Sequence, residues 1–176
     1  GGFTNSNSNS TEEFNGTSWS IAVNMITARY SLGAGGTGTA AIGFGGATNP
    51  ALQAVTERYN TETDLCSTTP FQLGAWSNAD NLNAGREQTG GFGSQNAAVT
   101  AGGSTSRTYE YDGSSWTSAN AMINGVVAHA GAGIQSAAMS LGGQNPGGTP
   151  LSCVEEYNGT TRATSTPLPD VRRYGG

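Results

Sequence analysis

The feature that most constrains this sequence is a fixed spacing, because each of its three tryptophans precedes a pair of glycines by 26 residues. The three sets are Trp19 with Gly45 and Gly46, Trp76 with Gly102 and Gly103, and Trp116 with Gly142 and Gly143. Six residues after each tryptophan comes a bulky apolar residue, and ten residues after the first two come Arg29 and Arg86. Self-similarity at a fixed offset indicates a repeat protein.

A second block, in which acidic residues precede an aromatic residue and a turn, recurs before the tryptophans. Its copies are Thr11-Glu12-Glu13-Phe14-Asn15-Gly16, Thr56-Glu57-Arg58-Tyr59-Asn60, Thr108-Tyr109-Glu110-Tyr111-Asp112-Gly113 and Glu155-Glu156-Tyr157-Asn158-Gly159. In the last copy Arg162 stands in place of tryptophan, while Arg172 keeps the arginine offset that Val126 breaks. Because both ends of the sequence cut through a unit, we expect it to be a segment of a longer protein.

The composition predicts strands rather than helices. Charged residues make up 11% of the chain and lysine is absent, so no typical helical stretch occurs. Short apolar runs alternate with turn residues, as in an all-β array. Each unit is expected to contain four strands, exemplified by 30–34, 40–46, the acidic-aromatic block and the segment through tryptophan. Asn15-Gly16, Asp112-Gly113 and Asn158-Gly159 predict tight primed hairpin turns between the last two strands.

Four short antiparallel strands in each unit are typical of a propeller blade. Glycine inside a strand costs roughly 0.5–1 kcal/mol relative to alanine, so the repeated pairs indicate close approach between neighbouring strands. The tryptophans are expected at equivalent outer-strand positions. The runs before the glycine pairs, which contain Ile42, Val99 and Met139, are expected to be buried inner strands.

The order arginine, Gly-Gly, tyrosine and tryptophan resembles the kelch repeat, whose fold is a β-propeller. The phrases Thr-Glu-Glu-Phe-Asn-Gly-Thr-Ser-Trp and Tyr-Glu-Tyr-Asp-Gly-Ser-Ser-Trp resemble the tandem kelch-like repeats of marine bacteriophage structural proteins, such as tail, fibre and decoration proteins. The kelch order predicts complete blades at 24–80, 81–120 and 121–165. Residues 1–23 would be outer strands of a preceding blade, and 166–176 the start of a further one. A small four-bladed ring, closed between the two ends, is the alternative.

Charge and length exclude several classes of function. No apolar run reaches the roughly 18 residues of a membrane span. The net charge of −5, with seven dispersed arginines, argues against nucleic acid as a partner. Cys66 and Cys153 are too few for a disulfide scaffold and are expected to lie too far apart to bond to each other.

No catalytic, metal or cofactor site is expected. The single histidine, His129, is predicted to be exposed or hydrogen-bonded on a first strand. Adjacent strand residues point to opposite faces, so the Glu12-Glu13 and Glu155-Glu156 pairs cannot converge on one substrate. We expect one carboxylate of each block to pair instead with the repeated arginine (Arg29, Arg86 or Arg172) of an adjoining blade.

Two loops are candidate binding surfaces, because loops on rigid repeats commonly carry function. The first is the insertion Glu62–Ala75 with Phe71, and the second is Gln144–Ser152, which includes Asn145. The alternative for both loops is simple connection or contact with neighbouring subunits, and an oligomer is possible. The resemblance to phage structural proteins implies a non-enzymatic virion protein, and the loops predict that it contacts other virion proteins or a host-surface glycan. A secreted or cell-surface adhesion module is the alternative.

Overall fold

The computed structural model describes residues 1–63 and 72–173, and every regular element in these ranges is a strand. Three four-stranded antiparallel sheets follow one another along the chain. Sheet 1 contains β5 (Gly33–Thr37), β6 (Ala40–Phe44), β9 (Thr56–Thr63) and β10 (Gln72–Ala79). Sheet 2 contains β11 (Thr89–Ser94), β12 (Ala97–Gly102), β13 (Thr108–Tyr111) and β14 (Trp116–Ala119). Sheet 3 contains β15 (Ala130–Ile134), β16 (Ala137–Leu141), β17 (Val154–Tyr157) and β18 (Arg162–Ser165).

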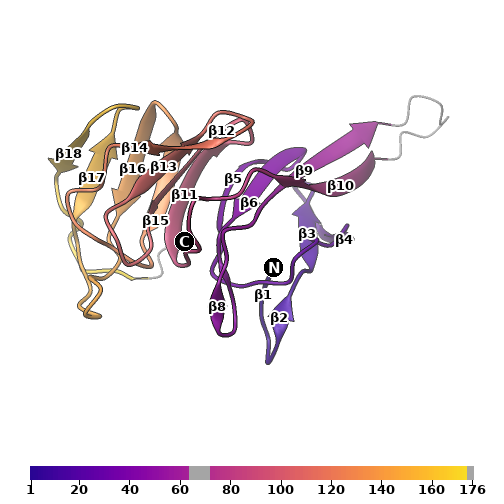
Figure 1. Cartoon of the computed structure of the whole chain (residues 1–176), viewed down its shortest axis with the longest axis horizontal. Coiled ribbons are helices and arrows are strands. Elements are labelled where there is room, and N and C mark those ends of the chain that lie inside the picture. The colour runs from indigo at the N-terminus through magenta and orange to yellow at the C-terminus, as the bar shows by residue number, and fades with distance from the viewer. Residues whose placement is uncertain (64–71, 174–176) are drawn as a thin grey trace.

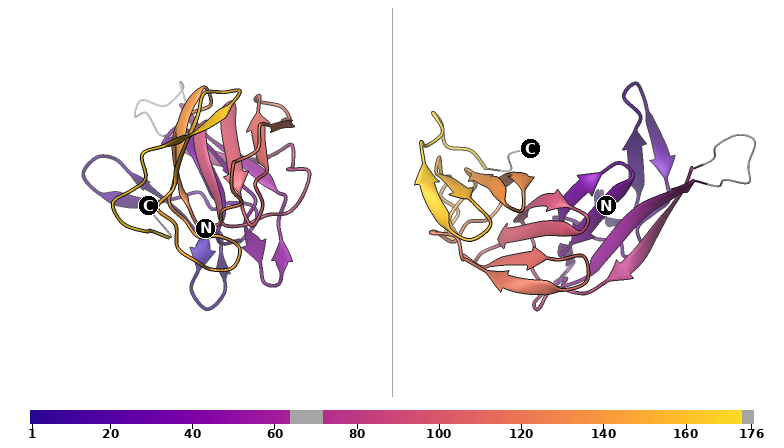
Figure 2. Two further views of the ribbon diagram at one scale, coloured as in Figure 1. Left: turned by 90° about the vertical axis from the view of Figure 1, so that its left-hand side faces the viewer. Right: turned by 90° about the horizontal axis from the view of Figure 1, so that it is seen from above.

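Three two-stranded pairs complete the fold: β1 (Gly2–Phe3) with β2 (Asn7–Ser8), β3 (Thr11–Phe14) with β4 (Trp19–Ala22), and β7 (Ala47–Thr48) with β8 (Ala51–Leu52). The β3–β4 hairpin and the three sheets lie along an arc (Figures 1 and 2). Within each sheet the strands are ordered as in the chain. Each predicted range, 24–80, 81–120 and 121–165, contains the four strands of one sheet.

The first strand of each sheet begins after a kink in the backbone. Sequence analysis predicted this strand at 30–34, whereas β5 begins at Gly33. Ser31, Gln88 and Ala128 occupy equivalent places before β5, β11 and β15, and their φ angles are 52°, 54° and 54°. A left-handed residue interrupts an extended strand, so each sheet starts two or three residues later than the apolar pattern suggests.

The hairpins β3–β4, β13–β14 and β17–β18 close with four-residue turns, so the prediction of two-residue primed turns was wrong. A primed turn needs positive φ at both central residues, but in the turn from Asn15 to Ser18 only Gly16 has positive φ, at 95°. The Asn15 side-chain oxygen instead accepts hydrogen bonds from the backbone N–H groups of Thr17 and Ser18, both at 2.9 Å. Asp112 and Asn158 act in the same way. The side-chain acceptor organises the wider turn.

The repeated glycine pairs lie at or just beyond the ends of the second strands. All six glycines have positive φ, between 62° and 92°. A Cβ on Gly45, Gly102 or Gly142 would meet the carbonyl oxygen of Arg86, Val126 or Arg172 at 2.7, 2.5 or 2.7 Å. Glycine is therefore required both by the backbone conformation and by the segment that leads into the next sheet.

Side chains between the sheets form the core. We call the side of a sheet that is turned toward the next sheet in chain order its forward face, and the opposite side its back face. Between sheets 1 and 2, Ile42 and Phe44 share a buried cluster with Ala98, Tyr111 and Trp116. Between sheets 2 and 3, the buried cluster contains Phe92, Val99, Ala138 and Tyr157. Each interface joins a forward face to a back face.

The second strands are buried in sheets 1 and 2 but only partly in sheet 3. Ile42 and Val99 are 1% and 0% exposed, whereas Met139, at the same place in β16, is 39% exposed. The prediction that all three inner strands are buried was therefore wrong for β16. Met139 lies on the forward face of sheet 3, which no described segment covers.

The two ends of the described chain do not form the four-bladed ring. Residues 166–173 run beside sheet 3, where the Leu168 N–H donates to the Ser152 carbonyl and the Arg172 N–H to that of Leu151. Among the described residues, no helix is long and apolar enough to cross a membrane. Cys153 has no disulfide partner within these ranges, and Cys66 lies outside them.

Candidate functional site

A buried ion pair anchors sheet 1. The side chains of Arg29 and Glu57 are both 0% exposed, and an Arg29 nitrogen donates to the Glu57 carboxylate at 2.6 Å. The same carboxylate accepts backbone N–H groups from Ile26 and Thr27 at 2.8 and 3.1 Å. Glu57 thereby fixes the segment that leads into β5. The predicted pairing of carboxylate with repeated arginine exists here, but within one sheet rather than between adjoining units.

In the other two sheets, different contacts take the place of the ion pair between Arg29 and Glu57. In sheet 2, Tyr109 stands where sheet 1 has Glu57, and the Arg86 guanidinium lies 4.5 Å from the centre of its ring. In sheet 3, Glu155 is 1% exposed and its charge partner is Arg162, at 3.9 Å. Arg162 occupies the tryptophan position and so supplies the cation that Val126 lacks.

The remaining predicted arginine pairing was wrong for two residues. Arg86 meets an aromatic ring, and Arg172 is 68% exposed and faces Asp170 at 3.9 Å. The contacts of Arg29, Arg86 and Arg162 are structural, because these three side chains are buried.

The tryptophans occupy equivalent register positions but differ in environment. Trp19, Trp76 and Trp116 each lie in an outer strand, opposite Phe14, Tyr59 and Tyr111. The two rings of each pair are 5.1–5.3 Å apart between centres. Trp116 is 5% exposed, whereas Trp19 is 67% exposed. Sheet 2 buries its tryptophan against sheet 1, while Trp19 remains accessible.

A groove of about 520 Å³ lies between the β3–β4 hairpin and sheet 1. Its aromatic lining comes from Phe14, Trp19, Tyr59 and Trp76. The Tyr59 hydroxyl donates a short hydrogen bond to Glu13, and burial, followed by Glu13, raises the pKa of Tyr59 to about 12. Further polar lining residues are Thr11, Glu12, Asn15, Ser20, Thr37 and Thr39. The groove therefore combines aromatic surfaces with carboxylates and hydroxyls. Sequence analysis did not predict it.

The groove is open because a glycine replaces a glutamine. In the first turn of sheet 2, Gln95 is 8% exposed and donates to the carbonyls of Ala41 and Tyr59 at 3.1 and 2.7 Å. Gln135 makes the matching contact from sheet 3, to the Tyr111 carbonyl at 3.3 Å. Sheet 1 has Gly38 at this place, and a Cβ added there meets no atom within 4 Å.

None of the described residues of the two predicted loops lines this groove. Glu62 lies in β9 and pairs with Leu73, while Phe71 and the rest of 64–71 lie outside the described residues. The strands of this hairpin have eight residues each, against four in β13 and β14, so it projects beyond its sheet (Figures 1 and 2).

The second predicted loop folds back on itself. The Asn145 side-chain oxygen accepts the Thr149 N–H at 2.9 Å, and Gln144 bridges to Val127 and Pro150. The structure brings neither Gln144 nor Asn145 to the groove.

His129 is buried, so the prediction of an exposed or hydrogen-bonded side chain was wrong. It is 6% exposed, and neither ring nitrogen has a hydrogen-bond partner among the described residues. Gly90 and Gly102 face the ring, and a side chain on either of them would crowd it. Burial, reinforced by the Arg162 charge, lowers the pKa of His129 from 6.5 to about 4. The described residues contain no cluster of three potential metal-ligating side chains.

Replacing His129 with leucine, the residue at the equivalent position 32, is expected to reduce acid sensitivity. Between pH 6.5 and about 4 the unfolded chain binds a proton at this histidine that the folded chain excludes. Stability therefore falls as the pH falls, by roughly 3 kcal/mol over this window. Urea unfolding at about pH 7 and about pH 4.5 measures the loss. Equal losses for the original chain and the His129→Leu variant would contradict the assignment.

Comparison with known proteins supports the fold only. No protein-family profile and no curated protein matches the sequence. Among solved structures, the chain resembles the one described as "Structure of YjhT", with a TM-score of 0.65 and 12% sequence identity. The alignment covers 84% of this chain and 49% of YjhT, so the chain spans about half the length of that protein.

Proposed function

We propose that the chain is part of a kelch-type β-propeller, in which each four-stranded sheet is one blade, and that it is a non-catalytic binding and structural protein of a virion. The shared strand order of the sheets and the equivalent positions of Trp19, Trp76 and Trp116 support the blade assignment. The virion assignment rests on the resemblance between the amino-acid sequences of these repeats and those of phage structural proteins. A secreted or cell-surface adhesion module is the second candidate.

The groove between the β3–β4 hairpin and sheet 1 is the proposed binding site, and the open position at Gly38 is the observation that carries it. Its volume of about 520 Å³ is within the range of small-molecule sites. The exposed Trp19 ring offers an apolar face, and Glu12 offers a hydrogen-bond acceptor. This combination suits a glycan, whose sugar rings present C–H faces and hydroxyl donors.

The groove walls are braced before any ligand binds. The indole N–H of Trp76 donates to the Val23 carbonyl at 3.0 Å, which ties β10 to the segment after β4. The hydrogen bond from Tyr59 to Glu13 joins the two walls. A braced site loses less conformational entropy on binding, so a modest number of contacts gives useful affinity.

Replacing Trp19 with alanine is expected to weaken glycan binding by about tenfold or more, because it removes a stacking surface worth at least about 1.4 kcal/mol. A glycan array identifies the ligand, and calorimetric titration measures the affinity. Ile21→Ala on the same hairpin is the control, because Ile21 is 88% exposed and does not line the groove. Unchanged affinity in Trp19→Ala would exclude the groove as the site.

The location is tested separately, because a glycan could be bound by a virion or by a cell surface. Mass spectrometry of purified particles from the source should detect the protein at a stoichiometry typical of a structural component. Its absence from intact particles, together with its presence in the secreted or surface fraction, would favour the second candidate.

A further inference from the structure

Two kinds of polar contact recur between neighbouring units. The Tyr157 hydroxyl of sheet 3 donates to Glu110 of sheet 2 at 2.7 Å, and Tyr59 of sheet 1 donates to Glu13 of the β3–β4 hairpin. The turn glutamines add a second contact, from Gln95 to the Tyr59 carbonyl and from Gln135 to the Tyr111 carbonyl. The interface between sheets 1 and 2 has only the glutamine contact, because Arg58 stands at the register position where sheet 2 has the acceptor Glu110. Each sheet thus presents a tyrosine or glutamine donor on its back face and acceptors on its forward face.

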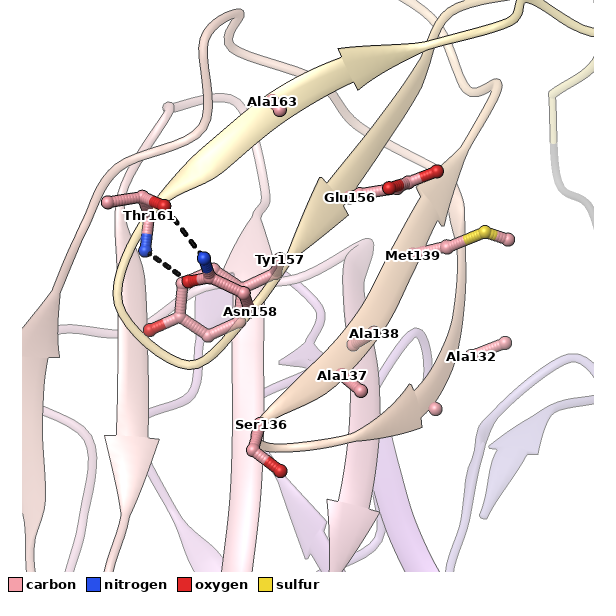
Figure 3. Close-up of a pocket in the computed structure, with 11 residues that line it drawn as sticks. Ala132, Ser136, Ala137, Ala138, Met139, Glu156, Tyr157, Asn158, Thr161 and Ala163 are labelled. Atoms are coloured by element: carbon pink, nitrogen blue, oxygen red, sulfur yellow. Dashed lines mark hydrogen bonds between the residues drawn. The ribbon is translucent and has the colours of Figure 1, made fainter.

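The acceptors on the forward face of sheet 3 have no such partner among the described residues. Ala132, Met139, Glu156 and Ala163 form one row across the sheet. Ala132, Met139 and Glu156 point to the same side (Figure 3), and this side is open as a depression of about 570 Å³. Glu156 is exposed.

The inner half of the matching row in sheet 2 is covered. The row consists of Phe92, Val99, Glu110 and Thr117, in the same register. Phe92 and Val99 are 3% and 0% exposed because sheet 3 packs on them through Ala138 and Tyr157. The forward face of sheet 3 therefore has the same layout as an interface that is occupied elsewhere in the molecule.

The segment that would lead to the next sheet is also in place. Before sheets 1 and 2 the arginine N–H donates to an upstream carbonyl, as Arg29 does to Ser8 and Arg86 to Gln53. The second glycine of each pair donates back to the carbonyl at the arginine position, as Gly46 does to Arg86. Arg172 repeats both contacts, since its N–H donates to Leu151 at 3.0 Å and its carbonyl accepts the Gly143 N–H at 2.6 Å.

We propose that the forward face of sheet 3 binds the back face of a further four-stranded sheet of the same repeat, which residues 166–173 lead into within this chain. A tyrosine of that sheet donates its hydroxyl to Glu156, and its turn glutamine donates to the Tyr157 carbonyl. Its small inner-strand residue packs on Met139, as Ala138 packs in the cluster with Val99. The inference does not depend on what the groove near Trp19 binds.

The test extends the chain with its own sequence. Because Arg172 corresponds to Arg86, residues 87–120 are repeated directly after Arg172, which supplies second copies of Gln95 and Tyr111. Hydrogen–deuterium exchange of β16 and β17 is expected to slow by about tenfold relative to the 176-residue chain. In the extended chain, Glu156→Gln should lower the melting temperature by about 2–4 °C. Replacing the added copy of Tyr111 with phenylalanine should abolish that difference.

The 176-residue chain is the control, and there Glu156→Gln is expected to leave the melting temperature unchanged while Glu110→Gln lowers it. Equal effects of Glu156→Gln in the two chains would overturn the proposal. An added unit that stays protease-sensitive, with unchanged exchange in β16, would overturn it as well. Sedimentation of the 176-residue chain should show a monomer, and a dimer that Glu156→Arg dissociates would assign this face to a second copy instead.

Discussion

Replacing Trp116 with alanine is expected to lower the free energy of unfolding by about 3–5 kcal/mol. The ring is 5% exposed and lies 5.0 Å from Phe44 and 5.1 Å from Tyr111 between centres. Its indole N–H also donates to the Thr56 hydroxyl at 3.0 Å. Truncation would open a cavity between sheets 1 and 2 and leave that contact unmade. Urea unfolding followed by far-ultraviolet circular dichroism measures the change.

Trp19→Ala is the matched control, because Trp19 occupies the same register position but is 67% exposed. Its removal is expected to change the unfolding free energy by less than about 1 kcal/mol. Similar losses for the two variants would show that burial between sheets does not distinguish the tryptophans.

Arg29→Met is expected to cost about 3–5 kcal/mol, because it leaves the Glu57 carboxylate buried without its charge partner. Both side chains are 0% exposed, so solvent cannot replace the lost interaction. The backbone donors of Ile26 and Thr27 remain and keep part of the carboxylate bound. Chemical denaturation at neutral pH gives the magnitude.

Arg172→Met tests whether the stabilisation depends on the position of the arginine in the repeat or on the burial of its side chain. Arg172 has the same offset in the repeat, but its side chain is 68% exposed and its contact with Asp170 is 3.9 Å long. Exposed pairs of this kind contribute little, so stability should hardly change. A large loss for Arg172→Met, or none for Arg29→Met, would contradict the ion-pair account.

The sequence repeat was sufficient to predict the four antiparallel strands of each of the three sheets, but not the additional β7–β8 pair in the first unit. The acidic-aromatic block and the tryptophan segment pair in register, with Phe14 opposite Trp19 and Tyr111 opposite Trp116. These elements are local, since a short turn joins the two strands. Their prediction needed only alternation of side chains and the turn residues at Asn15, Asp112 and Asn158.

Features that depend on contacts between sheets were not predictable from one copy of the repeat. Arg162 looked like a lost tryptophan, but it supplies the charge partner of Glu155 in the unit where Val126 replaces arginine. His129 looked exposed because the glycines that make room for its ring lie on other strands. Val126 in place of arginine and Arg162 in place of tryptophan lie in the same unit. Considering these two substitutions together could have indicated that Arg162 takes over the role of the missing arginine.

The groove was missed because its signal is the absence of a side chain. Gly38 stands where Gln95 and Gln135 cross to the preceding sheet, and aligning the three turns would have pointed to it. The predicted loops at Glu62 and Gln144 were chosen for irregularity, which does not identify a concave surface. Internal comparison of the repeats is therefore more informative here than loop length.

Gly38→Gln tests the central claim most directly, because it restores the missing contact and should close the groove in one step. No atom lies within 4 Å of a Cβ at this position, so the side chain can enter. The account predicts a gain in stability of about 1 kcal/mol and loss of glycan binding, measured by unfolding and titration of one sample. Gly38→Ala, the control, should keep binding. Undiminished glycan binding by a folded Gly38→Gln variant would contradict the claim.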